Sequence, residues 1–194
     1  MNHTAYQRLI IAYHGCDAGV ADEVFNGGSL KPSENQYDWL GRGIYFWEHG
    51  PTRALEWAVE QKRRRRLKTP AVVGALIQLG SCFDLLDVHF TRALERGYQW
   101  MDSIHRLSGK PLPLNLPARE EDGDQLLRHL DCAVVNWTIE TLELDDPSVR
   151  FQSVRGVFQE GQEAFPGSMI RSKSHIQIAV RDPACIVGYF RPVS

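Results

Sequence analysis

The chain has 194 residues, of which 43% are hydrophobic and 24% are charged, and these values predict one globular domain with a single sizeable core. The net charge of −2 argues against nucleic-acid binding through an overall basic field, although it leaves a local basic patch open. No stretch approaches the ~20 apolar residues of a spanning helix, and no basic segment precedes an apolar one at the N-terminus, so we expect a soluble cytoplasmic protein without a membrane partner.

The cysteine pattern gives no sign of a covalent or metal framework. Cys16, Cys82, Cys132 and Cys185 lie far apart, without a C-x-x-C pair and without histidines at zinc-finger spacing. Disulfide scaffolds and structural zinc sites both need such closely spaced ligands or cysteines. The sequence therefore predicts reduced thiols and no metal cofactor.

The first forty residues read as a strand, a helix and a loop. The apolar run at 9–15 predicts a buried strand that ends beside a histidine and a glycine. Apolar positions at helical spacing over 18–25 predict a helix, which Asn26-Gly27 ends. The polar segment 29–40 carries a proline and two aromatic residues, so we expect a loop that folds over a ligand.

A glycine-aromatic stretch comes next. Gly41-Arg42-Gly43 lets the backbone pass close to a neighbour, and the apolar residues 44–47 predict a strand. Gly50-Pro51 breaks that strand, and Thr52 is expected to be the N-cap of an amphipathic helix. The nearly continuous apolar run 71–79 predicts a central strand. Strand, tight loop and helix in this order are a common way of holding a flat ligand, although a core strand followed by a surface helix fits the same pattern.

The helix that begins at Thr52 ends in a cationic run over residues 62–68, which contains four consecutive arginines. Cations on a last turn complement the helix dipole, which favours a solvated helix end. The alternative is a contact with the phosphates of RNA or DNA.

The second half of the chain is helical first and then strand-rich. A mixed helix is expected at 88–107, an exposed proline-containing excursion at 108–123 and a second helix at 124–142. The remaining expected elements are strands at 83–87, 151–158, 174–180 and 185–190, with a loop at 159–168. This order predicts an α+β fold with a mostly antiparallel sheet.

Three motifs together resemble the ADP-ribosyltransferase superfamily, on its diphtheria-toxin and poly(ADP-ribose)-polymerase side. They are Tyr13-His14-Gly15; Gly41-x-Gly43-Ile44-Tyr45-Phe46 followed by a helix that enters at Ala54; and a late strand in which Gln177 stands five residues before Asp182. The resemblance implies two small, mostly antiparallel sheets that form an NAD cleft. It also implies a single domain over residues 1–194, in which 87–149 is a helical insertion.

The same resemblance implies roles for individual residues. His14 would bond an NAD ribose hydroxyl, the Gly15 backbone would take the nicotinamide amide, and Tyr45 would stack on the nicotinamide ring. These residue types suit the tasks, because neutral histidine both donates and accepts, glycine permits close approach, and tyrosine buries a planar face. Gly43 and Phe46, which flank Tyr45, are expected to bind the cofactor as well. A purely structural strand-end histidine is the alternative for His14.

Two positions depart from the family pattern. The polymerases place a tyrosine two residues after the helix alanine, where this chain has Glu56, and the aromatic Trp57 follows it. Trp57 is either the second stacking residue or a core residue. At the third catalytic position the family has a glutamate, whereas Gln177 keeps a hydrogen bond but supplies neither charge nor a base. Single transfer is therefore favoured over chain elongation.

A carboxylate in the preceding loop offers a compensation. Glu163, or alternatively Glu160, would activate the incoming nucleophile, because this loop faces the acceptor in the family. A solvated loop acid is the competing interpretation.

The function that the resemblance implies is mono-ADP-ribosyl transfer from NAD+ to a macromolecular acceptor, either protein or RNA/DNA. By analogy, the chain is compared with bacterial toxins of toxin-antitoxin or phage-defence systems, whose partner is an antitoxin protein. The alternatives are a catalytically weak NAD- or ADP-ribose-binding module and an NAD glycohydrolase.

Overall fold

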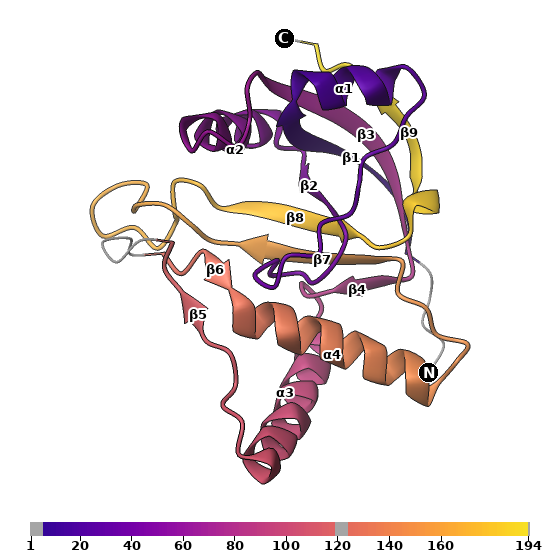
Figure 1. Cartoon of the computed structure of the whole chain (residues 1–194), viewed down its shortest axis with the longest axis vertical. Helices are drawn as coiled ribbons and strands as arrows, with labels where there is room; N and C mark the ends of the chain where they lie inside the picture. Colours follow the sequence, from indigo (N-terminus) through magenta and orange to yellow (C-terminus); the bar gives the residue numbers. More distant parts are fainter. Residues whose placement is uncertain (1–5, 119–123, 194) are drawn as a thin grey trace.

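The computed structural model describes residues 6–118 and 124–193 and is α+β, as the sequence predicts (Figure 1). Within these residues the helices are α1 (Ala18–Phe25), α2 (Pro51–Arg63), α3 (Val88–Ser108) and α4 (His129–Asp145), with a short 3-10 helix η1 (Pro183–Cys185). The strands are β1 (Tyr6–Asp17), β2 (Ile44–Glu48), β3 (Pro70–Gly80), β4 (Cys82–Asp84), β5 (Asn115–Leu116), β6 (Leu127–Arg128), β7 (Ser153–Phe158), β8 (His175–Val180) and β9 (Ile186–Phe190).

Seven strands form one sheet in the order β4-β7-β8-β2-β1-β3-β9, and every neighbouring pair is antiparallel except β4 and β7. β1 pairs with β3 along most of its length but with β2 only at Ala12 and Tyr13. The sheet thus has two halves joined at a short junction, and the strands of one half run across those of the other in Figure 1. The expectation of two separate sheets is corrected, because the pairing at Ala12 and Tyr13 continues the ladder from one half to the other.

Two hydrophobic cores cover the sheet. The first packs Phe46, Val73 and Ile178 with apolar residues of α1. The second lies between the β4-β7-β8 half and helices α3 and α4, where Phe83 and Ile139 have no exposed surface. Residues 87–149 therefore supply a large part of the second core.

Several element boundaries differ from the sequence patterns: β1 extends beyond the expected 9–15 at both ends, and β4 ends at Asp84 instead of residue 87. Two helix starts also differ. α2 begins at Pro51 with Gly50 as its N-cap, so Thr52 is not the cap; proline favours the first helical position because its missing N–H is not needed there. The helix expected from residue 124 begins at His129, since Leu127 and Arg128 instead pair with β5. Residues 119–123 of the expected excursion, and residues 1–5, lie outside the described part of the chain.

All four cysteines are buried free thiols. Across the described ranges, no helix combines the length and the apolar character that crossing a membrane requires.

Candidate functional site

The sheet brings three residues that are distant in sequence onto three consecutive strands. His14 lies on β1, Tyr45 on β2 and Gln177 on β8. Trp47 pairs with Gln177, and Tyr45 pairs with Ala179, two positions further along the same face. His14 follows directly after the last residue of β1 that pairs with β2, where the two strands separate into a fork.

His14 links the two strands at this fork. Its ring Nδ1 lies 2.7 Å from the carbonyl oxygen of Tyr45, and because a carbonyl only accepts, Nδ1 must donate. The other nitrogen, Nε2, is then an acceptor in the neutral ring. Burial lowers the pKa of His14 below 6.5, and the hydrogen bond to Tyr45 opposes that shift without cancelling it. His14 is consequently a neutral donor and acceptor at pH 7.

Tyr45 anchors the loop that precedes β2. Its hydroxyl donates to the Gly41 carbonyl at 2.7 Å and accepts from the Leu40 amide at 3.0 Å, while its ring packs on the second core. Burial raises its pKa well above 10, so the hydroxyl stays protonated. The neighbouring Phe46 points into the first core with no exposed surface, so in this structure it is a core residue.

The two predicted binding glycines both permit close packing within the protein. A Cβ on Gly15 would collide with the carbonyl oxygen of Ala54 in α2, and it would lie 3.2 Å from the ring of Trp57. A Cβ on Gly43 would lie 2.9 Å from the carbonyl oxygen of Val180. Packing alone thus accounts for glycine at both positions. Trp57 also packs against Trp47, with ring centroids 5.7 Å apart.

Gln177 is covered by the loop before β2. Its Oε1 accepts a hydrogen bond of 2.6 Å from the indole nitrogen of Trp39. The Trp39 ring also packs against Phe158 of β7, and a Cβ on Gly156 would lie only 2.7 Å from it. Trp39 of the segment 29–40 therefore covers the third candidate position.

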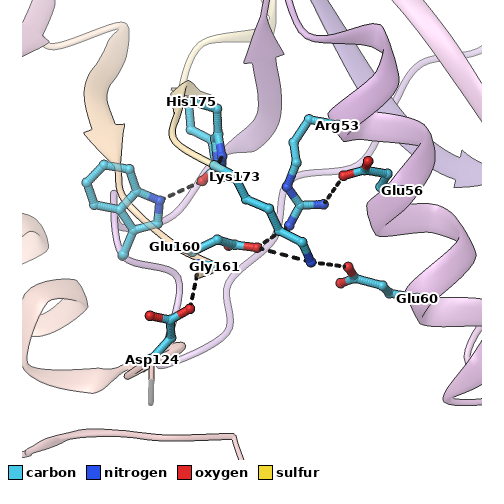
Figure 2. A network of polar contacts seen from close by, with 10 residues as sticks. Arg53, Glu56, Glu60, Asp124, Glu160, Gly161, Lys173 and His175 are labelled. Atoms are coloured by element: carbon cyan, nitrogen blue, oxygen red, sulfur yellow. Dashed lines mark hydrogen bonds and ion pairs between the residues drawn. The ribbon is translucent and has the colours of Figure 1, made fainter. Parts of the chain in front are cut away.

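A cluster of charged residues lies beside this face, where α2 meets the loop between β7 and β8 (Figure 2). Arg53 of α2 forms an ion pair of 2.5 Å with Glu160, whose exposed fraction is 9%. Lys173 bonds Glu60 of α2 at 2.8 Å. The structure thus places the less favoured loop acid, Glu160, in the cluster. By contrast, Glu163 is exposed, and its carboxylate accepts from the Gly167 amide within its own loop.

Several buried polar atoms of this cluster have no hydrogen-bond partner within the described residues. They are Nε1 of Trp47, Nε and Nη1 of Arg53, and Nε2 of His175. The three side chains adjoin one another, because the Trp47 ring lies 6.1 Å from that of His175 and 5.9 Å from the Arg53 guanidinium carbon. A buried donor or acceptor without a hydrogen bond costs about 1–3 kcal/mol, so a polar ligand that bonded the Trp47 and His175 nitrogens or Nε of Arg53 would gain free energy. Nη1 of Arg53 lies 3.9 Å from the Glu56 carboxylate.

Two open hollows of about 420 Å³ each lie elsewhere, and Arg42 lines both of them. One is lined by α4 residues such as Asn136, and the other by Gly43, Arg181 and neighbours. Neither includes His14, Tyr45 or Gln177 in its lining. We place the candidate site at the fork and the cluster beside it, because Trp47, Arg53 and His175 of that cluster carry buried polar atoms without a hydrogen bond, whereas the hollows are defined by shape alone.

No protein-family model matches the chain, and no solved structure matches it. The chain is 24% identical over 200 residues to the uncharacterized protein MJ0359 of Methanocaldococcus jannaschii, and the alignment covers 94% of this chain and 86% of that protein.

Proposed function

We propose that the protein is a mono-ADP-ribosyltransferase that cleaves NAD+ and transfers ADP-ribose to a macromolecular acceptor, protein or nucleic acid. The observation that carries this proposal is the placement of His14, Tyr45 and Gln177 on three consecutive strands at the fork of the sheet. The further suggestion that the protein is a bacterial toxin of a toxin-antitoxin or phage-defence pair, with an antitoxin protein as partner, is made by analogy alone.

The residues at the fork divide the work of such a reaction. The free Nε2 lone pair of His14 accepts a hydrogen bond from a ribose hydroxyl, and the Tyr45 ring and Gly15 backbone hold the nicotinamide. The amide oxygen of Gln177 presents a partial negative charge to the ribosyl cation that develops as the nicotinamide leaves. Trp39, which covers Gln177, limits the access of water. Orientation rather than a covalent enzyme intermediate supplies most of the acceleration.

A binding module for NAD or ADP-ribose is the second candidate. It is favoured by the side chain at position 177: Gln177 has an amide where the family has a carboxylate, and that amide already accepts a hydrogen bond from Trp39. An NAD glycohydrolase is the third. Release of nicotinamide excludes the binding module, and transfer of label to an acceptor excludes a pure glycohydrolase.

The proposal is tested with the purified protein, NAD labelled in its adenylate part and a cell lysate. We expect nicotinamide release and a labelled macromolecule. Replacing His14 with alanine is expected to slow release at least about 10-fold, because the lone pair for the ribose and the link to Tyr45 are both lost. The matched control is His49→Ala, which changes an exposed histidine at the end of β2. Equal rates for wild type and His14→Ala would contradict the assignment of His14.

The cationic run at the end of α2 offers a test of the acceptor class. Arg63, Arg64, Arg65 and Arg66 are exposed, and no carboxylate within the described residues pairs with them. Ten residues of helix separate Arg53 from Arg63, which corresponds to about 15 Å, so a polyanion bound there would reach the fork.

If the acceptor is a nucleic acid, reversing these four charges to glutamate is expected to reduce labelling of the nucleic-acid fraction by more than about 10-fold at 0.1 M salt, since phosphate contacts are lost. Nicotinamide release should be unchanged, and Arg106→Glu on α3 serves as an exposed control. Undiminished labelling of every fraction would remove the support for a nucleic-acid acceptor.

A further inference from the structure

His175 occupies a defined place beside the candidate third catalytic residue. It lies on β8 two residues before Gln177, so both side chains project from the same face of the sheet. Its Nδ1 lies 2.6 Å from the carbonyl oxygen of Lys173. Because a carbonyl only accepts, the proton resides on Nδ1, and Nε2 carries the lone pair. A backbone carbonyl thus fixes both the tautomer and the orientation of this ring.

The free nitrogen of His175 is enclosed. Nε2 is buried without a hydrogen-bond partner among the described residues, and the ring packs between Phe158 and Trp47, with centroids at 5.7 and 6.1 Å. The charged groups around it are Arg53 of α2, and Lys173 and Glu160 of the loop between β7 and β8 (Figure 2). An acceptor lone pair held in this way is a site for a ligand O–H or N–H.

The protonation state agrees with this geometry. Burial lowers the pKa of His175 to about 4; the hydrogen bond to the Lys173 carbonyl opposes the shift, and the charge of Arg53 adds to it. The ring is therefore neutral, with its lone pair available, throughout the physiological pH range.

We propose that His175 is the general base that accepts the proton of a hydroxyl acceptor during ADP-ribosyl transfer. This inference rests on the proposed function. The acceptor oxygen bonds to the anomeric carbon of the nicotinamide ribose, and the bond from that carbon to the nicotinamide nitrogen breaks with its electron pair going to the ring. The acceptor proton passes to Nε2 of His175, which later releases it to solvent. NAD+ and R–OH thus give R–O–ADP-ribose, nicotinamide and a proton.

The neighbouring side chains explain why His175 is the base. The need for a base in turn indicates a hydroxyl acceptor. Gln177 has no basic atom, Glu160 is held by Arg53, and the Glu163 carboxylate is turned to its own loop. A carboxylate acceptor is already ionised at pH 7 and needs no base, whereas an alcohol does.

The test compares wild type, His175→Gln and the control His105→Gln with labelled NAD and the lysate. His105 on α3 also points its Nδ1 to backbone carbonyls, but it is exposed. For His175→Gln we expect transfer to fall about 10-fold, below the usual 10²- to 10⁴-fold contribution of a general base, because a pKa of about 4 makes this base weaker than one with a pKa near pH 7. Binding of NAD, measured calorimetrically, should be retained, and His105→Gln should behave as wild type.

Two measurements on wild type keep the inference testable if the variant does not fold. First, the labelled linkage should resist neutral hydroxylamine, which cleaves esters but not the acetal formed by a hydroxyl. Second, because the pKa of His175 is about 4, the transfer rate should fall only below about pH 5. A hydroxylamine-labile product, or a His175→Gln variant that transfers as fast as wild type, overturns the inference. A wild-type protein that neither releases nicotinamide nor labels any acceptor overturns the proposed function itself.

Discussion

Replacing Arg155 with methionine is expected to lower the free energy of unfolding by about 3–5 kcal/mol. Arg155 of β7 is 5% exposed and reaches across β8 to Glu48 of β2, with two contacts of 2.6 and 3.0 Å, and it also bonds Asp84 of β4 at 3.1 Å. Methionine preserves much of the volume but leaves two buried carboxylates without their cation. Since domains are stable by only about 5–15 kcal/mol, the loss is a large part of the total.

The measurement is equilibrium unfolding in urea, in which the midpoint should fall while the slope stays constant. Arg150→Met is the matched control: this arginine pairs with Glu143, but its side chain is 73% exposed, so the change should be within about 1 kcal/mol. A shift for Arg155→Met no larger than that of the control would show that the buried pairs contribute little net stability.

Local chemistry explains how far the sequence predicted the fold. The apolar runs and glycine breaks gave α1, β2 and β3 to within about a residue or two of their ends, because period and punctuation are properties of the segment itself. The junction at Ala12 and Tyr13 was not predictable, since it depends on pairing between strands and not on either strand alone. The role of α3 and α4 in the second core was missed for the same reason.

The residues of the candidate site divide in the same way, into those that a local pattern reveals and those that depend on a partner far along the chain. Resemblance to a family singled out His14, Tyr45 and Gln177, and the fold places them on neighbouring strands. Arg53 was missed because its partner Glu160 stands 107 residues later, and no local pattern connects the two. His175 carried a usable signal: strand alternation puts it on the face of Gln177. The expectation that favoured Glu163 over Glu160 weighed loop position alone, whereas burial beside Arg53 distinguishes the two acids.

The second large effect is expected at Gln177. Gln177→Ala removes the amide oxygen that we propose to face the ribosyl cation, so nicotinamide release should fall about 10²- to 10³-fold, the usual cost of removing one preorganised electrostatic group. The Trp39 indole also loses its acceptor, which loosens the covering loop. Release is followed by chromatography of labelled NAD, with Gln162→Ala as control because that glutamine lies exposed in the loop between β7 and β8.

Gln177→Glu separates the electrostatic role from a structural one. A glutamate retains an oxygen for the Trp39 indole and adds a full negative charge, which stabilises a cationic transition state more strongly than an amide dipole. We therefore expect nicotinamide release above the wild-type rate, and the gain should be larger than any change in NAD affinity, since charge that develops only in the transition state acts on kcat. Unchanged release in both Gln177→Ala and Gln177→Glu would mean that this position does not face the reacting ribose. In that case NAD is cleaved without help from Gln177.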